Sequence, residues 1–262
     1  MNVAPDFNTI GRRNLLKSAA GLSLAAVLAD PALARAAAAT TETIHLKTEG
    51  GRDVTGALAR PDQASAPAII LVHEWWGLND QIKSVAVDFA SQGYLALALD
   101  LFGVPAATTP DEARALVGKV DPAAAADIVS SWIKWGRGAP GADGKLGIIG
   151  WCFGGGWALQ GSTFVPVDAT VIYYGKCDLP AAQLAKLQGP VLGHFGTQDP
   201  TMNHEMVGKF EAAMKEDGKE ETVYWYDAPH AFANPTGANY HKAETQLAWS
   251  RTTAFLAKYL KA

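Results

Sequence analysis

The chain has 262 residues, of which 48% are hydrophobic and 18% are charged, a balance typical of a folded globular protein and not of a disordered one. Its 22 lysines and arginines stand against 26 aspartates and glutamates, giving a formal net charge of −4. Without a basic run or a stripe of basic and aromatic residues, a nucleic acid is not expected as a partner. Internal repeats and low-complexity linkers are also absent from the sequence, which favours one domain.

The first 36 residues have the pattern of an export signal. Gly11–Lys17 carries a twin arginine, Ser18–Ala29 is apolar, and Ala34-Arg35-Ala36 has the small-x-small form of a cleavage site. The alternative is a membrane anchor, but the apolar run is shorter than the ~20 residues that a spanning helix needs. We therefore predict cleavage of residues 1–36, no stable membrane anchor afterwards, and a periplasmic or secreted protein.

From residue 42 to residue 262, apolar runs alternate with helix-like stretches. Thr43–Lys47 and Asp53–Leu58 flank Gly50-Gly51 and predict an opening β-hairpin. Continuously apolar runs predict strands that are buried on both faces of a parallel sheet, at Ala68–His73, Tyr94–Asp100, Leu146–Gly150, Ala169–Tyr174, Pro190–Phe195 and Thr222–Tyr226. Helices are predicted at Gln81–Gln92, Asp111–Val120, Ala123–Gly136, Gly155–Thr163, Ala181–Leu187, His204–Asp217 and Tyr240–Leu260. This alternation predicts an α/β domain whose mostly parallel sheet is flanked by helices.

The segment Gly150-Trp151-Cys152-Phe153-Gly154 has the form of a nucleophile elbow with cysteine at the central position. Glycines on either side allow a strand and a helix to pass close to a sharp turn, which exposes the central side chain. The start of the helix would favour a thiolate and offer backbone N–H groups to an oxyanion. Cys152 is therefore our candidate nucleophile.

A thiol needs a base, and the base needs an acid to orient it, in the chain order nucleophile, acid, histidine. Asp199 follows the predicted strand Pro190–Phe195, and His230 follows Thr222–Tyr226. Taken singly, Asp199 could be a turn residue and His230 a surface histidine. Their placement at the same sheet edge as Cys152 predicts a Cys-His-Asp triad. The buried position of His194 indicates a core histidine, and metal-ligand spacing is not seen, so no metal or cofactor is predicted.

The loop after the strand Ala68–Val72 is expected to complete the site. Such loops supply the second oxyanion donor, so we predict an oxyanion hole formed by the N–H groups of Trp75 and Phe153. Glu74 would be a site carboxylate able to pair with the thiol, because a charge between a buried strand and two tryptophans is costly without a partner. Its alternative is an exposed loop acid. His73 either lines the site or ends the strand.

Four segments in this order resemble the dienelactone hydrolase family: His73–Asn79, Ala98–Gly103, Gly150–Gly155 and Pro229–Phe232. The similarity covers about residues 42–260. It implies an α/β-hydrolase fold without a cap domain and a triad at Cys152, His230 and Asp199. It also implies a carboxymethylenebutenolidase-like hydrolase acting through a thioester. In that family the glutamate matching Glu74 interacts with the resting thiol and gives way when substrate binds.

The chain departs from the family in lacking the arginines that grip the substrate carboxylate near the second and last segments. The substrate is therefore expected to be a small lactone or ester and not necessarily a dienelactone. The predicted pocket is apolar and aromatic, and comprises Trp76, Trp151, Phe102, Phe232 and Asn234. One alternative is a broad carboxylesterase. The other is a periplasmic binding protein on a hydrolase scaffold, in which Cys152 is oxidised with Cys177, the only other cysteine.

Overall fold

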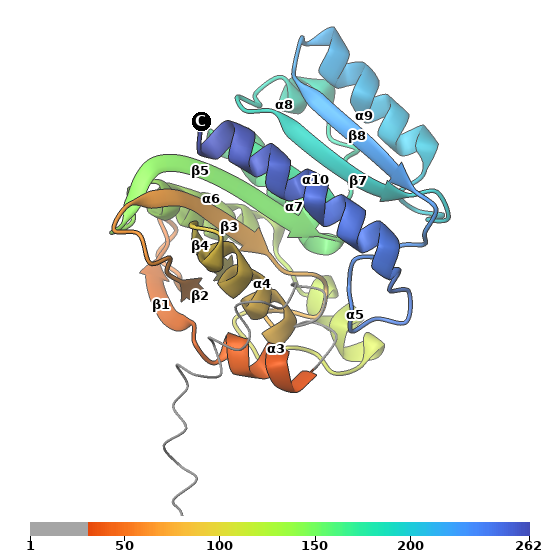
Figure 1. The fold of residues 1–262 in the computed structure, drawn as a ribbon. Coiled ribbons are helices and arrows are strands. Elements are labelled where there is room, and N and C mark those ends of the chain that lie inside the picture. The colour runs from red at the N-terminus through yellow and green to blue at the C-terminus, as the bar shows by residue number, and fades with distance from the viewer. Residues whose placement is uncertain (1–30) are drawn as a thin grey trace, which may run out of the picture.

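One eight-stranded sheet organises the computed structural model, which describes residues 31–262 (Figure 1). The strand order is β1-β2-β4-β3-β5-β6-β7-β8, in which β1, β2 and β4 pair antiparallel and all later neighbours pair parallel. The strands are β1 Glu42–Lys47, β2 Asp53–Ala59, β3 Ala66–Val72, β4 Leu95–Leu99, β5 Ala142–Trp151, β6 Ala169–Tyr173, β7 Val191–Gly196 and β8 Glu221–Tyr226. The opening hairpin and the mostly parallel sheet predicted from the sequence are confirmed.

Helices cover both faces of this sheet. On one face, α4 (Asp80–Ser91) and α10 (Lys242–Leu260) contribute Phe89 and Leu256 to the same hydrophobic cluster. The opposite face is covered by α6 (Pro122–Gly138), α7 (Phe153–Phe164), α8 (Ala181–Leu184) and α9 (His204–Glu216). Residues 31–262 contain two further helices, α3 (Pro31–Ala38), which packs on α4, and α5 (Pro110–Gly118).

The central strands are largely apolar because they face helices on both sides. In β3, Ile69 and Leu71 join the cluster beneath α4 and α10, whereas Ile70 and Val72 join the cluster beneath α6 and α7. Every residue of β3 is buried, as is every residue of β4, β6 and β7. Side chains alternate between the faces of a strand, so burial on both sides requires continuous apolar sequence.

Polar residues at the predicted boundaries cap several helices. The Asn79 side chain accepts from the N–H of Ile82 at the start of α4, and Thr109 and Glu112 form a capping box at α5. Most element boundaries differ from the predictions by one to four residues, as three examples show. The strand β5 begins at Ala142, where it already pairs with Ala66 of β3; α8 is only one turn long; and α10 begins after its cap, His241.

The predicted export signal lies mostly outside the described residues, including its twin arginine and its apolar run. Its last six residues, 31–36, form part of α3, in which Ala34 and Ala38 are buried. Cleavage after Ala36 would therefore remove most of this helix. Within residues 31–262, no helix combines the length and apolar character needed to cross a membrane.

Parallel strands place their carboxyl ends at one edge of the sheet. The loops that follow β3, β5, β7 and β8 carry Glu74, Cys152, Asp199 and His230 to this edge. Ligands of open α/β sheets bind beyond the carboxyl ends of the strands. The topology therefore brings together residues that are up to 156 positions apart in the sequence, Glu74 and His230.

Candidate active site

A strained turn holds Cys152 between β5 and α7. Its φ of 52° and ψ of −118° lie in a region that residues with a side chain rarely adopt. A Cβ atom on Gly150 would lie 2.0 Å from the carbonyl oxygen of Gly154, and one on Gly154 would lie 2.3 Å from those of Val72 and His73. Both positions therefore require glycine, as the elbow pattern predicts.

His230 lies between Cys152 and Asp199. Its Nε2 is 3.1 Å from the sulfur of Cys152, and its Nδ1 is 2.5 Å from Oδ2 of Asp199. The other carboxylate oxygen of Asp199 accepts from the backbone N–H groups of Thr201 and Met202, at 2.9 and 3.0 Å. These bonds fix the carboxylate, so the imidazole ring is held with one nitrogen facing the thiol.

The charges of Asp199 and His230 stabilise each other. Burial alone lowers the pKa of His230, but the hydrogen bonds with Asp199 and Cys152 outweigh it and raise the pKa to about 10. Burial opposes ionisation of Asp199, yet its hydrogen bonds with His230, Met202 and Thr201 leave its pKa lowered. At neutral pH the histidine is therefore a cation between the Asp199 carboxylate and the Cys152 sulfur.

Two backbone donors have no acceptor within the described chain. The N–H groups of Phe153, the first residue of α7, and of Trp75, in the loop after β3, make no hydrogen bond there. The partial positive charge at the start of α7 adds to the field at this point. Free N–H groups beside a nucleophile are what an oxyanion hole requires.

Glu74 is buried beside the triad, with a relative exposure of 4%. Its carboxylate oxygens accept from Asn234 Nδ2 at 2.5 Å and from the Tyr174 hydroxyl at 3.2 Å. Burial raises its pKa, which the two hydrogen bonds and the charge of His230 only partly offset. The expected pairing of Glu74 with the thiol does not occur in this structure, where the thiol contacts His230.

The mostly parallel sheet flanked by helices agrees with comparisons against known proteins. The family model that matches residues 54–260 is described as the dienelactone hydrolase family. The chain belongs to this family. The resemblance inferred from four sequence segments is thus confirmed, and the chain is a hydrolase with the family's α/β fold.

Individual relatives of the dienelactone hydrolase family match over most of their length. The chain is 27% identical to the carboxymethylenebutenolidase of Pseudomonas putida, over 83% of this chain and 96% of the relative. It is 32% identical to a Salmonella typhimurium protein named "Putative carboxymethylenebutenolidase", over 80% of this chain and 84% of the relative. A structure of a dienelactone hydrolase-like promiscuous phosphotriesterase from metagenomic libraries has a TM-score of 0.78 at 22% identity. It covers 84% of this chain and 98% of that one, and supports the fold.

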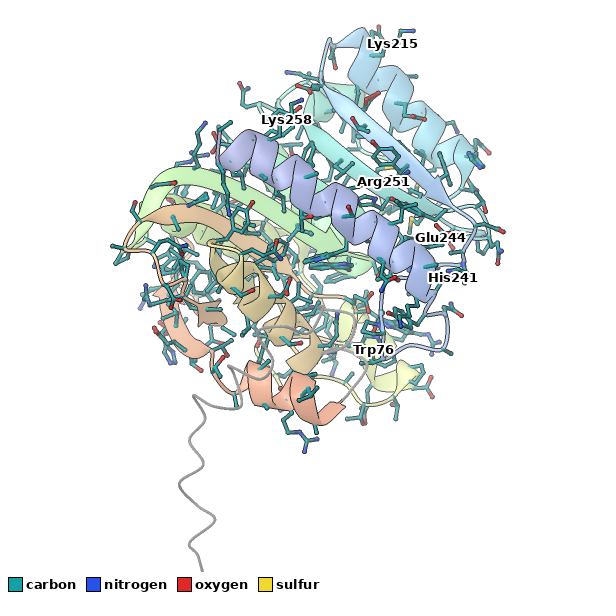
Figure 2. All side chains as sticks on the ribbon, in the orientation of Figure 1. Trp76, Lys215, His241, Glu244, Arg251 and Lys258 are labelled. Carbon is teal, nitrogen blue, oxygen red and sulfur yellow. The ribbon has the colours of Figure 1, made fainter. Side chains whose placement is uncertain are left out.

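The residues predicted to line the pocket of this family member divide into two groups. Trp76 and Phe102 are partly exposed, and Trp76 lies at the end of the molecule where α10 begins (Figure 2). Trp151 and Phe232 are instead core residues, with relative exposures of 4% and 0%. Trp151 is the last residue of β5, directly before Cys152, and it stacks on Tyr173 of the neighbouring strand in the core. Asn234 is also buried, and its side chain donates to Glu74.

Tyr174 is a site residue that the sequence predictions missed. It directly follows β6, has a positive φ of 39°, and is fully buried with its ring against His230 at a centroid distance of 5.1 Å. Its hydroxyl holds Glu74. The signal that could have identified it is its place at the carboxyl end of the strand adjacent to the elbow strand.

Cys177 is not bonded to Cys152, because both thiols are free. Cys177 is fully buried in a hydrophobic cluster with Leu159 and Ile172. Burial raises its pKa to about 12, so it is a thiol at neutral pH. The structure therefore does not contain the disulfide on which the binding-protein alternative depends. His194, predicted to be a core histidine, is fully buried and contacts Tyr226 and Thr252.

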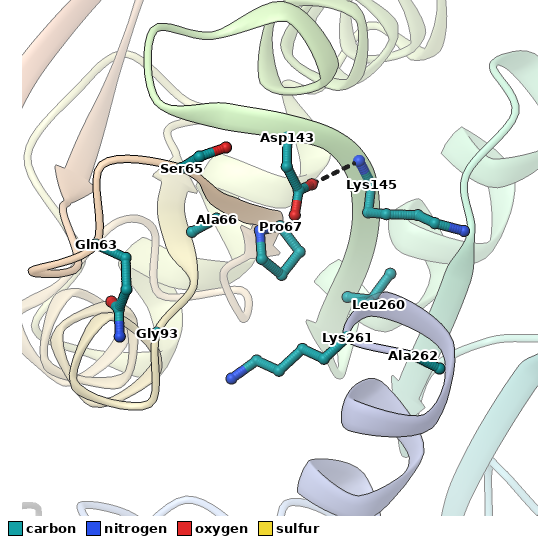
Figure 3. Close-up of a pocket in the computed structure, with 10 residues that line it drawn as sticks. All are labelled: Gln63, Ser65, Ala66, Pro67, Gly93, Asp143, Lys145, Leu260, Lys261 and Ala262. Carbon is teal, nitrogen blue, oxygen red and sulfur yellow. Dashed lines mark hydrogen bonds between the residues drawn. The ribbon is translucent and has the colours of Figure 1, made fainter.

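A shallow pocket lies at the other edge of the sheet (Figure 3). Its lining includes Ala66 at the start of β3, Asp143 near the start of β5, and Lys261 at the chain end. None of the triad residues reaches it. Across residues 31–262, no group of three or more histidine, cysteine or acidic side chains is arranged to hold a metal ion.

Proposed function

We propose that this hydrolase cleaves small lactones or esters, in the manner of a carboxymethylenebutenolidase, with Cys152 as a covalent nucleophile. The observation that carries the proposal is the continuous contact from Asp199 through His230 to the sulfur of Cys152, at a turn whose φ is 52°. An inert structural cysteine would need neither this strained backbone nor a buried acid behind a histidine.

In the first half of the reaction, the Cys152 thiolate attacks the carbonyl carbon of the substrate. The negative charge moves to the carbonyl oxygen, where the N–H groups of Trp75 and Phe153 would bind it. The bond to the leaving oxygen then breaks, and His230 gives its Nε2 proton to that oxygen. The products are an alcohol or enol and a thioester on Cys152, with His230 now neutral.

In the second half, His230 accepts a proton from water, and the resulting hydroxide attacks the thioester carbonyl. The same two N–H groups would bind the second oxyanion. When the carbon–sulfur bond breaks, Cys152 leaves as a thiolate and the acid product departs. Asp199 stays ionised throughout, because its role is to orient His230 and stabilise its cation.

The expected substrate carries no carboxylate of its own. Within residues 31–262, arginine side chains contact groups other than the triad, such as Asp168 for Arg137 and Tyr226 for Arg251. Aromatic rings lie next to the elbow instead, with Phe153 packing on Phe102 at a centroid distance of 5.6 Å. Apolar surroundings favour uncharged esters, and a thiolate nucleophile favours a good leaving group such as an enolate.

The test is hydrolysis of a panel of uncharged lactones, enol esters and alkyl esters, with a carboxylated dienelactone included. Cys152→Ala should abolish turnover, whereas Cys177→Ala, which removes the other thiol, should retain it. The proposal fails if Cys152→Ala is as active as the wild type. A higher kcat/KM for the carboxylated dienelactone than for every uncharged substrate would refute the substrate class, and a preference for alkyl esters would favour the broad carboxylesterase.

We also propose that residues 1–36 direct the folded protein to the periplasm or outside the cell. Support comes from the twin arginine at Arg12 and Arg13, followed by a short apolar run. Replacing both arginines by lysine should leave the full-length protein in the cytoplasmic fraction. Unchanged export of this variant would refute the proposal.

A further inference from the structure

His73 is a buried histidine for which the mechanism above has no use. It directly follows β3, and its relative exposure is 0%. Its ring lies between the loop after β3 and the loop after β4, at the edge of the sheet that carries the triad. Nδ1 is 2.6 Å from the carbonyl oxygen of Glu74, and the backbone N–H of Leu101, after β4, points to Nε2 at 3.1 Å.

These two contacts determine where the imidazole carries its proton. The N–H of Leu101 can only donate, so Nε2 of His73 accepts and has no hydrogen. The carbonyl of Glu74 can only accept, so Nδ1 carries the hydrogen and donates it. Burial lowers the pKa of His73, although contacts with Glu74 and Asp100 partly oppose this, so the ring stays neutral at neutral pH.

The carbonyl that His73 holds belongs to the same peptide unit as the N–H of Trp75. A trans peptide is planar, and its C=O and N–H point in opposite directions. Fixing the carbonyl therefore fixes the direction of the N–H. A second donor, the N–H of Gly77 at 3.2 Å, holds the same oxygen. Gly77 has a φ of 90°, which suits the tight turn that this bond closes.

The elbow is packed against the two peptide units that precede the Glu74–Trp75 peptide in the chain. The close approach of Gly154 to the carbonyl groups of Val72 and His73 leaves no space for a Cβ atom. The ring of Phe153 is 6.5 Å from that of His73, and Phe102 packs on the same ring at 4.8 Å. His73 thus joins the loop that carries the Trp75 donor to the helix start that carries the Phe153 donor.

From this geometry we propose that His73 is a positioning residue for catalysis: its Nδ1–H sets the orientation of the Glu74–Trp75 peptide, and thereby aims the Trp75 N–H at the oxyanion. The inference rests on the proposed function, since it assigns a role to one of the proposed oxyanion donors. His73 does not touch the substrate. Its effect belongs to the transition state, when the oxygen becomes charged, and should appear in kcat and not in KM.

Two amide variants separate this role from simple space filling. In His73→Asn the side-chain amide nitrogen can take the place of Nδ1 and donate to Glu74. In His73→Gln the amide reaches the place of Nε2 and can accept from Leu101, but the bond to Glu74 is lost. We expect His73→Gln to lose about 10- to 100-fold in kcat, with KM changed less than about 3-fold, and His73→Asn to lose less than about 5-fold, because removal of a whole oxyanion donor costs 10²–10³.

Equal kcat values for the wild type and His73→Gln would overturn the proposal. Equal losses in both variants would also overturn it, because the hydrogen bond to Glu74 would then not decide the rate. Crystal structures of both variants give a readout independent of activity. The Glu74–Trp75 peptide should rotate in His73→Gln and stay in place in His73→Asn, and an unrotated peptide in His73→Gln overturns the positioning role. If the wild type hydrolyses no substrate, the proposed function fails, and the peptide orientation alone decides the inference.

Discussion

Replacing Asp199 by Asn tests the electrostatic coupling within the triad. The change keeps the size of the side chain but removes the charge that lies 2.5 Å from Nδ1 of His230. The pKa of His230 is about 10, against an ordinary value of 6.5. If Asp199 supplies about half of that difference, its loss destabilises the imidazolium by about 2.4 kcal/mol, at 1.36 kcal/mol per pH unit. An amide can also hold the imidazole in the wrong tautomer, so kcat should fall on the order of 10³-fold or more.

The assay is the pH dependence of kcat/KM with an uncharged enol ester. In the wild type, activity should decline only as His230 loses its proton near pH 10, and in Asp199→Asn the alkaline decline should begin about 2 pH units lower. The control is Asp227→Asn. Asp227 is an exposed acid that accepts from Gln198 on a neighbouring loop and does not contact His230. An unchanged alkaline limb in Asp199→Asn would refute the coupling.

Three further outcomes follow from the same contacts. Gly150→Ala should lower the free energy of unfolding by about 3 kcal/mol or more, because its Cβ would lie 2.0 Å from a backbone oxygen. The control Gly208→Ala places its Cβ in open space on α9 and should stabilise the protein by up to about 1 kcal/mol. Urea unfolding measures both changes. Asn234→Ala should cost about 1–3 kcal/mol in the same assay, because buried Glu74 loses a donor, and no cost would refute that role. The pKa of His230 is higher in the folded state, so its contribution to stability is complete below pH 6.5 and lost as pH rises through about 10. The wild type should therefore lose more stability over this range than His230→Gln, and parallel curves would contradict the shift.

The fold could be predicted from the sequence because its signals are local and repeated. Runs such as Ala68–His73 and Ala169–Tyr174 are almost entirely apolar, as is typical of strands between two layers of helices. The predicted boundaries are wrong where contacts with residues distant in the sequence determine where an element begins or ends. The strand β5 begins earlier than predicted because Ala142 pairs with Ala66 of β3, a partner that lies 76 residues away in the sequence.

The structure brings together the predicted site residues that follow strand ends, but it does not do so for all of their neighbours in the sequence. Cys152, Asp199 and His230 each follow a strand, so they lie at the same edge of the sheet, where hydrogen bonds join them. Sequence proximity to the elbow suggested a pocket role for Trp151. However, successive residues of a strand face opposite sides of the sheet, and Trp151 turns into the core. The hydrogen bond of Glu74 with Asn234 joins residues 160 positions apart, which no local pattern reveals.

The central claim is that Cys152 becomes acylated during turnover. We would mix the wild-type protein with an uncharged aryl or enol ester, quench in acid within milliseconds, and locate any added acyl mass by peptide mass spectrometry. The account predicts the acyl group on the peptide that contains Cys152 and not on the peptide that contains Cys177, with a burst of leaving group of about one equivalent. Full turnover with no acyl group on Cys152, or equal turnover by Cys152→Ala, would contradict it.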